Sequence, residues 1–475
     1  MKNKTVLSNL WFYKYRFQIG YLLLLASYIL ILFYTIFIAP NGLTKNEVNS
    51  AVSSYNLSTG NIFSKEIIDL PFKLLQKISI TLLGLSNLSI KLPSILLSFL
   101  AILLILELTK KWFAHRTAIL ATIIAITSSQ FFFIAQDGTS NILSIIYPLL
   151  LIITGIDFFN ELKRKQLVTF LLVVAFLGLY TPLNIYITIA LLLTASLHPK
   201  VRLKLKQLPK KYKAVSLVIL AFAFTPIAIA IYNDIDTLKA ILLLPNNLNI
   251  LDNSIKLINI LFGSSGEYSN GVISPIINVA SLILIVIGLY FILIQKYTVR
   301  SYLILIWLVV ALLTCFINTS TTPVLFLPLL LLTATGLQNL IQTWYAIFPR
   351  NPYARFFGLI PISFVVVSLL VTNLNIFRQS YMYNPYIVNS FNQDLKLLLS
   401  HQNSINNLLV SSEEKPFYSI LNSKIKMLDE YSENNLAITH KIFTEKGIPK
   451  NYKVKKVITN NLKNDSDRFY ILAKD

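Results

Sequence analysis

Two acidic residues of this chain occupy positions where a carboxylate could act as a general acid or base. Asp137 follows a wholly apolar run, in the segment Phe-Phe-Phe-Ile-Ala-Gln-Asp-Gly-Thr-Ser-Asn at residues 131–141, which contains no lysine or arginine. A carboxylate held against an apolar surface is partly desolvated, which favours a functional role for Asp137. The alternative is that Asp137 caps the helix that follows. Glu47 is the weaker candidate, because a single glutamate in a polar loop is usually solvent-exposed.

The elements that hold these acids are predicted to be membrane-spanning helices. Hydrophobic residues make up 55% and charged residues 13% of the 475 residues, so the chain has more apolar surface than a soluble domain can bury. The net charge of +21 would indicate nucleic-acid binding in a soluble protein, but here the basic residues stand in short clusters between apolar runs. The sequence therefore predicts contact with membrane lipids and no nucleic-acid partner.

Each membrane crossing needs about 20 apolar residues. Runs of that kind lie at residues 18–39, 91–109, 117–135, 142–159, 214–232, 273–294, 302–317, 323–341 and 357–377. A further run at 167–196 is expected to cross twice, because both of its flanks are basic and Pro182 interrupts the helix. The predicted fold class is an all-α polytopic membrane protein with about eleven transmembrane helices.

The positive-inside rule orients these helices, since basic clusters mark cytoplasmic loops. The N-terminal segment and every later basic cluster between the runs fall inside. The short loops at 136–141, 180–183 and 318–322 carry no lysine or arginine and fall outside. The first run is longer than the apolar core of a usual signal peptide and is expected to be retained. We expect a multi-pass protein of the plasma membrane with a cytoplasmic N-terminus.

Two outer regions are long enough to build a site. The first, residues 40–90, contains Glu47 and a predicted amphipathic helix on the membrane surface that begins near Pro71. The second, residues 233–272, ends in a glycine-rich stretch at 263–271, where a mobile lid and a plain solvated loop are equally compatible with the sequence.

The hydrophobicity drops after Phe377. Segments 406–411, 452–459 and 468–473 are predicted strands, which indicates a small α/β domain. The predicted division is therefore a transmembrane domain at 1–377 and a soluble domain at 378–475. An odd number of crossings places this second domain outside the cytoplasm.

Motifs for metal or cofactor binding are missing from the sequence. It contains no Walker phosphate loop, dinucleotide fingerprint, nucleophile elbow or HExxH helix. The predicted topology puts His115 and His198 inside and His401 and His440 outside, so the histidines do not form one zinc site. The single cysteine, Cys315, excludes an intramolecular disulfide and a thiolate cluster. No metal and no cofactor are predicted.

The order of first helix, acidic outer loop, Asp137 turn and long later outer loop resembles the GT-C glycosyltransferases related to protein O-mannosyltransferases and lipid A aminoarabinose transferases. Segment 43–51 stands where that family has an Asp-Glu pair, and segment 85–96 resembles its Gly-x-Ser and Arg-Leu-Pro-Ser motifs, with Lys91 in place of arginine. Further similar segments are the third helix with its aspartate, a Leu-Thr-Lys-x-Pro hairpin and a late helix, at residues 125–141, 178–182 and 327–337.

The resemblance implies transfer of a sugar from a polyprenyl phosphate to an acceptor outside the cytoplasm, which is a cell-envelope glycan, a lipid or a protein. It implies Asp137 and Glu47 as the catalytic carboxylates. The implied substrate-binding residues, which include the cations near the lipid phosphate, are Lys45, Asn46, Lys91, Glu267 and Arg378. Asn46 replaces the first acid of the family's pair, so either Glu47 has taken over the acidic role or activity is lost.

Two other classes of function remain open at this stage. One is a transporter or flippase of lipid-linked sugars. The argument against it is that no ionisable residue is predicted at mid-bilayer, where a transporter would bind ions or a charged substrate. The other is a non-catalytic membrane assembly protein with the same fold.

Overall fold

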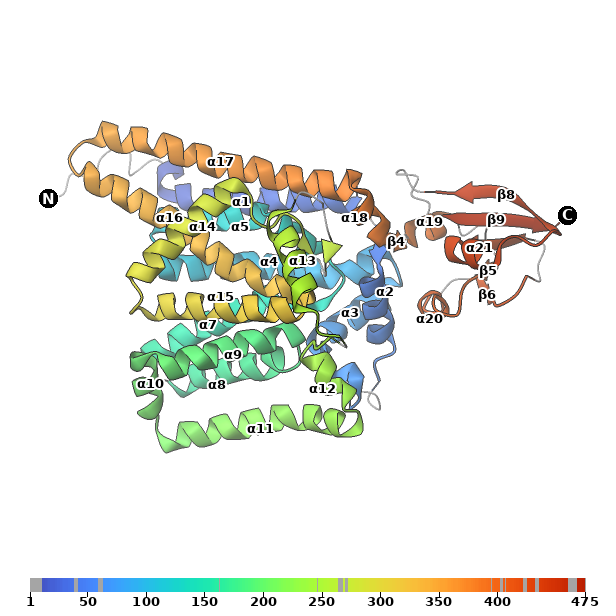
Figure 1. Cartoon of the computed structure of the whole chain (residues 1–475), viewed down its shortest axis with the longest axis horizontal. Helices are drawn as coiled ribbons and strands as arrows, with labels where there is room; N and C mark the ends of the chain where they lie inside the picture. Colours follow the sequence, from blue (N-terminus) through green and yellow to red (C-terminus); the bar gives the residue numbers. More distant parts are fainter. Residues whose placement is uncertain are drawn as a thin grey trace.

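The computed structural model describes the chain apart from residues 1–10, 38–41, 59–62, 162, 246, 264–267, 270–271, 394, 402–404, 406, 422–424, 432–434, 460–467 and 475. Most of the described residues form helices packed side by side in one body, with a small sheet domain at one end (Figure 1). The helices of this body are α1 (Trp11–Phe37), α4 (Asn87–Trp112), α5 (His115–Thr127), α6 (Ser129–Gln136), α7 (Leu143–Glu161), α8 (Arg164–Val173), α9 (Pro182–Leu197), α10 (Pro199–Lys206), α11 (Lys210–Asn233), α14 (Val279–Ile294), α15 (Val299–Ile317), α16 (Phe326–Ile347) and α17 (Pro352–Tyr383).

Several of these helices have the length and composition of membrane spans. In the described part of the chain, six are long and apolar enough, or up to eight if each of two bent helix pairs is one span. Two further apolar stretches, residues 18–33 of α1 and α14, are shorter. The fold is therefore helical with multiple apolar helices, and the count of about eleven crossings stays a prediction.

The run at 167–196 is broken where the sequence predicts. α8 continues as a π-helix, η4 (Val174–Gly178), and α9 begins at Pro182 after a short turn. Pro182 occupies the first turn of α9, where a missing backbone N–H costs no hydrogen bond. The predicted helix break at residues 180–182 is confirmed.

The first outer region folds into α2 (Lys45–Tyr55), the 3-10 turn η2 (Lys65–Ile67) and α3 (Leu70–Leu83). Thr44 and Glu47 form a capping box at the start of α2. Leu75, Ile78 and Leu82 of α3 are exposed, whereas Phe72 is buried. The place of α3 at the membrane surface stays a prediction. The other outer elements are η3 (Ser140–Ile142), α12 (Asp236–Ile241), α13 (Ile250–Phe262), β2 (Tyr268–Ser269), β3 (Val272–Ile273) and η5 (Thr319–Leu325). The glycine-rich stretch falls largely outside the described residues.

The C-terminal domain contains a five-stranded sheet in the order β6-β5-β7-β9-β8. β5 is parallel to β6 and β7, whereas β9 is antiparallel to β7 and β8. Its elements are α18 (Pro385–Ser390), α19 (Leu395–Ser400), β5 (Asn407–Leu409), α20 (Lys415–Tyr418), β6 (Lys426–Leu428), β7 (Asn435–Thr439), α21 (His440–Lys446), β8 (Tyr452–Ile458) and β9 (Phe469–Lys474). The three predicted strands are confirmed as β5, β8 and β9, whereas β6 and β7 were not predicted.

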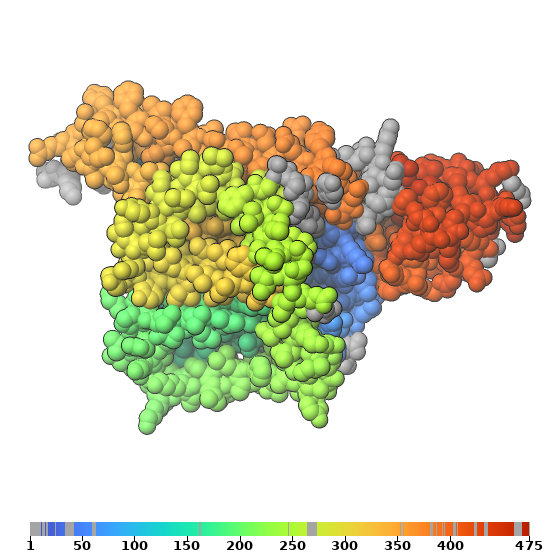
Figure 2. Space-filling view, viewed as in Figure 1, coloured from blue at the N-terminus to red at the C-terminus, as the bar shows by residue number. Residues whose placement is uncertain are grey.

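The C-terminal domain packs on the first outer region. β1 (Leu43–Thr44) pairs with β4 (Phe391–Gln393), and one hydrophobic cluster joins residues such as Val48 and Ile90 to Leu408 and Phe417. In Figure 2 the first outer region, in blue, lies between the helical body and the C-terminal domain, in red. The domain thus lies on the same face as the first outer region. The odd number of crossings stays a prediction. The cellular side of this face and the domain boundary at residue 377 stay predictions.

Candidate functional site

Glu47 lies inside the protein, at the third residue of α2. Its Oε2 accepts a hydrogen bond from the Thr44 N–H at 2.7 Å, and its Oε1 accepts one from the Gly138 N–H at 2.8 Å. Lys91 Nζ of α4 lies 3.5 Å from the same Oε1, and both side chains are almost completely buried, at 1% and 3% exposure. The solvent-exposed alternative for Glu47 is therefore wrong. Its carboxylate joins α2, α4 and the turn after α6.

Asp137 follows α6 directly and is also buried. Its Oδ2 accepts hydrogen bonds from the Thr139 hydroxyl at 2.6 Å and the Asn141 side-chain amide at 2.7 Å. Its Oδ1 has no hydrogen-bond partner among the described residues. No described backbone N–H of the following helix donates a hydrogen bond to the Asp137 carboxylate. The alternative that Asp137 caps this helix is therefore wrong for the described residues.

The charge environment of Asp137 differs from the cation-free turn that the sequence suggests. Burial and the negative charge of Glu47 raise the pKa of Asp137 to about 7, while the bonds from Thr139 and Asn141 and the charge of Lys91 lower it. Lys91 comes from another helix, so the local sequence around Asp137 could not reveal it. Asp137 can therefore bind or release a proton near neutral pH.

A cavity of about 690 Å³, here called the outer cavity, lies beside this centre. Its polar wall residues come from α2, from η2 and α3 with the residues between them, from the turn after Asp137 and from the C-terminal domain. They include Asn46, Ser50, Lys65, Glu66, Asp69, Lys73, Thr139, Ser140, Asn141 and Glu413. Thr139 and Asn141, which hold the Asp137 carboxylate, line it, whereas Asp137 and Glu47 do not. Both predicted catalytic carboxylates therefore stand behind the cavity wall.

The sequence reasoning missed all five charged residues of this wall, which are Lys65, Glu66, Asp69, Lys73 and Glu413. Glu66 Oε2 and Lys73 Nζ form an ion pair at 2.7 Å, and Lys73 also donates to the Glu66 carbonyl oxygen at 3.1 Å. Asp69 stands between them at the start of α3. An Asp-Leu-Pro sequence is typical of an ordinary helix start. The only sequence feature that could have indicated a functional role for Asp69 is therefore its place in the first outer region.

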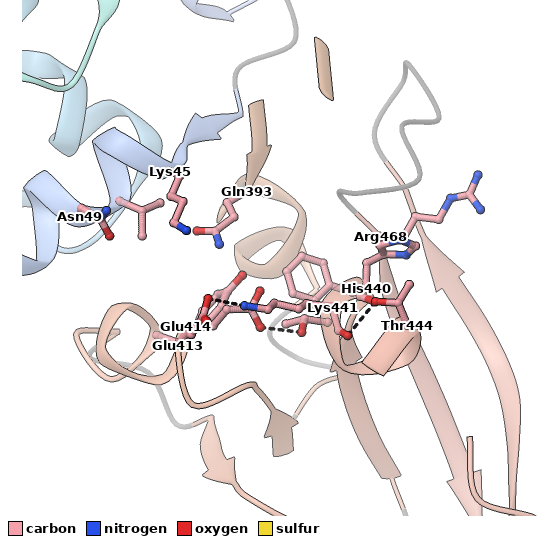
Figure 3. Close-up of a pocket in the computed structure, with 13 residues that line it drawn as sticks. Lys45, Asn49, Gln393, Glu413, Glu414, His440, Lys441, Thr444 and Arg468 are labelled. Carbon is pink, nitrogen blue, oxygen red and sulfur yellow. Dashed lines mark hydrogen bonds and ion pairs between the residues drawn. The ribbon is translucent and has the colours of Figure 1, made fainter. Parts of the chain in front are cut away.

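A second cavity of about 640 Å³, the interdomain cavity, separates α2 from the C-terminal domain (Figure 3). Lys45 and Asn49 face it from α2. Glu413 and Lys441, which form an ion pair at 2.6 Å, face it from the C-terminal domain. Val48, Asn49 and Glu413 line both cavities, so the two adjoin.

The remaining predicted site residues are divided by the structure. Lys45 is exposed and lines the interdomain cavity, and Asn46 is exposed and lines the outer cavity. Lys91 is paired with Glu47. Arg378 is exposed on α17 and lines neither cavity. Glu267 lies outside the described residues. Among the described residues, no group of three or more His, Cys, Asp and Glu side chains is placed to hold a metal ion.

Comparison with known proteins gives a family match over part of the chain. Residues 71–229 match the family described as dolichyl-phosphate-mannose-protein mannosyltransferase. This segment runs from the start of α3 into α11 and includes Lys91 and Asp137. No curated protein matches the sequence.

Solved structures resemble the whole chain. ArnT from Cupriavidus metallidurans in the apo state matches with a TM-score of 0.58 at 9% identity, over 96% of this chain and 98% of that one. The same protein bound to undecaprenyl phosphate matches with a TM-score of 0.54 at 11% identity, over 95% and 97%. The archaeal oligosaccharyltransferase AglB from Archaeoglobus fulgidus, in complex with an inhibitory peptide and a dolichol-phosphate, matches with a TM-score of 0.52 at 12% identity, over 91% and 70%. At these identities the likeness concerns the fold.

Proposed function

We propose that this chain, which has the fold of the GT-C membrane glycosyltransferases, transfers a sugar from a polyprenyl-phosphate donor to an acceptor at the outer surface of the plasma membrane. The observation that carries the proposal is the outer cavity, where carboxylates and lysines from separate elements meet beside the Asp137 turn. The matching structures that hold undecaprenyl phosphate and dolichol-phosphate support a lipid-phosphate donor. The acceptor is a glycan, lipid or protein of the cell envelope.

The outer cavity contains the two kinds of group that this reaction needs. The acceptor oxygen or nitrogen attacks the anomeric carbon, and its proton must pass to a carboxylate. The bond between that carbon and the phosphate oxygen breaks, so negative charge grows on the lipid phosphate and a nearby cation stabilises it. Lys65 supplies positive charge on the cavity wall beside the ion pair of Glu66 and Lys73, and the amide of Asn46 can donate a hydrogen bond to substrate.

Asp137 and Glu47 act in this proposal as positioning residues. Asp137 fixes the hydroxyl of Thr139 and the amide of Asn141, both of which line the cavity. Glu47 fixes the backbone of Gly138 against α2, and Lys91 balances its charge. Loss of either carboxylate would displace the wall that contacts substrate, and small displacements of reacting groups reduce rates strongly. Lys45 faces the interdomain cavity and is proposed to contact the acceptor.

The test is transfer by the full-length protein in lipid nanodiscs. A panel of radiolabelled polyprenyl-phosphate sugars is supplied together with an envelope extract, and label is followed from the donor to water-soluble, lipid or polymer products. We expect label from one of the donors to appear in an acceptor product, together with free polyprenyl phosphate. The same donors in sealed vesicles report movement across the bilayer. Movement of intact donor without bond cleavage would favour the transporter alternative and contradict the proposal.

A further inference from the structure

Asp69 has an unusual backbone conformation at the edge of the outer cavity. It occupies the N-cap position of α3 with φ of 60° and ψ of 23°, which is the left-handed region. An N-cap aspartate normally has an extended backbone and accepts a hydrogen bond from the helix, but the Asp69 side chain makes no cap bond. Non-glycine residues held in this region carry strain, and such strain is often found at functional sites.

The backbone around Asp69 is fixed by hydrogen bonds on both sides. Its N–H donates to the Tyr180 carbonyl oxygen at 2.8 Å, which ties it to the turn before α9. Its own carbonyl oxygen accepts from the N–H groups of Phe72 and Lys73, both at 3.0 Å. These bonds fix the backbone from which the Asp69 carboxyl group extends at the cavity wall.

Among the carboxylates that line the outer cavity, only Asp69 has no ion pair within the described residues. Glu66 pairs with Lys73 at 2.7 Å, and Glu413 pairs with Lys441 at 2.6 Å. The Oδ1 atom of Asp69 is buried and has no hydrogen-bond partner among those residues. A carboxylate held by a lysine is a weakened proton acceptor, which leaves Asp69 as the available one.

The electrostatic surroundings agree with this assignment. Burial raises the pKa of Asp69 to about 6, while the hydroxyl of Ser140 and the charge of Lys73 lower it. The other charged groups on the same cavity wall are Lys65, Glu66 and Glu413. A carboxyl group with a pKa just below neutrality is ionised at pH 7 and yet basic enough to take a proton during the reaction.

We propose that Asp69 is the general base of the sugar transfer, a catalytic residue that takes the proton of an acceptor hydroxyl or amine. The inference rests on the proposed function. As the acceptor atom forms its bond to the anomeric carbon, the bond to the phosphate oxygen breaks with its electron pair, and the acceptor proton moves to the Asp69 carboxylate. Water then removes that proton. Asn46 lines the same cavity, but a neutral amide cannot take this proton.

The test compares Asp69→Asn with Asp69→Glu in the transfer assay. Asp69→Asn should lower kcat by about a hundredfold to ten-thousandfold, as expected for a lost general base, and should leave the affinity for undecaprenyl phosphate within a few-fold of wild type. In wild type, kcat should fall as the pH drops through about 6, because protonation removes the base, and this part of the fall should be absent in Asp69→Asn. A part near pH 7, from protonation of Asp137, should remain in that variant. Asp69→Glu should recover part of kcat. Asp236→Asn, an exposed acid elsewhere on the outer face, is the matched control and should behave as wild type.

The outcomes separate this inference from the proposed function. If wild type transfers sugar and Asp69→Asn does so within a few-fold with the same pH profile, Asp69 is not the base although the function stands. If wild type cleaves none of the donors, the proposed function fails and the catalytic role fails with it. Dicyclohexylcarbodiimide, which reacts with protonated carboxyl groups in apolar surroundings, gives a readout without turnover. Labelling of Asp69 should increase below pH 6 and be blocked by undecaprenyl phosphate. No labelling at any pH would contradict a proton-accepting Asp69.

Discussion

Glu47 and Asp69 belong to the same outer region, but the protein uses their carboxylates in different ways. Glu47 is 1% exposed, and both of its oxygens accept backbone hydrogen bonds, with Lys91 close by. Asp69 lies at a cavity, in a strained conformation, with one oxygen that no described residue bonds. A carboxylate whose oxygens all accept hydrogen bonds inside the protein stabilises the fold. A carboxylate beside a cavity with an oxygen that accepts no hydrogen bond is available for substrate. Residue type and position in the chain do not distinguish the two.

The largest effect is expected from Lys91→Met, which leaves Glu47 charged and buried without its cation. Removing one partner of a buried ion pair costs about 3–5 kcal/mol, so the free energy of unfolding in detergent should fall by that amount. Lys455→Met, at an exposed lysine of β8, is the control and should change little. The double variant with Glu47→Gln should lose less than the sum of the two single losses, because the unpaired charge is gone. Additive losses would mean that the pair is not coupled.

Asp137→Asn should reduce transfer by about a hundredfold, while expression and thermal stability stay near wild type. The amide keeps the shape of the side chain but loses the charge that holds Thr139 and Asn141. Since Asp137 is a positioning residue here, the fall in kcat near pH 6 should remain in this variant. If that fall disappears with Asp137→Asn and persists with Asp69→Asn, the two acids have exchanged the roles proposed for them.

A smaller effect should appear in the pH dependence of stability. The pKa of Asp137 is raised to about 7 in the folded protein, above its unfolded value of about 4, so the folded state holds a proton that the unfolded state releases. Its contribution to stability is therefore fully present below about pH 4 and is lost as the pH rises to about 7. Thermal unfolding in detergent across this range should show Tm falling in wild type and falling less steeply in Asp137→Asn. An equal slope in both proteins would assign the titration to other groups, of which Asp69 is the first to test.

The sequence predicted the helical body better than it predicted the site. The break at Pro182 followed from basic flanks, and β5, β8 and β9 followed from local alternation of apolar residues, because both signals are local. The strands β6 and β7 carry weaker local patterns, and they are held in the sheet by neighbours distant in sequence.

The site depends on contacts that no local pattern contains. Asp137 and Glu47 were recognised as acids of interest, but Gly138 and Lys91 decide how they are used. Asp69 was missed because neither its positive φ nor its backbone hydrogen bond to Tyr180, which lies far along the chain, is visible in the local sequence. Sequence alone therefore locates the region of the site and leaves its working groups to the tertiary structure.

The smallest effect on stability is expected at the Glu413 and Lys441 pair, whose side chains are 71% and 33% exposed. Exposed pairs of this kind contribute little to folding, so Glu413→Gln should unfold as wild type does. Any change in transfer would then report contact with a substrate, because Glu413 lines both the outer and the interdomain cavity. We expect the KM for the acceptor to rise several-fold, with kcat and the affinity for undecaprenyl phosphate unchanged.

The control is Lys415→Met, which breaks another exposed ion pair of the same domain, with Asp429. This pair lines neither cavity, so the variant should leave the acceptor KM, kcat and the affinity for undecaprenyl phosphate at wild-type values. If Glu413→Gln also leaves the acceptor KM unchanged, the acceptor does not pass between α2 and the C-terminal domain. If it lowers kcat to the extent of Asp69→Asn, the cavity has a second working carboxylate, and the contrast between paired and unpaired acids fails.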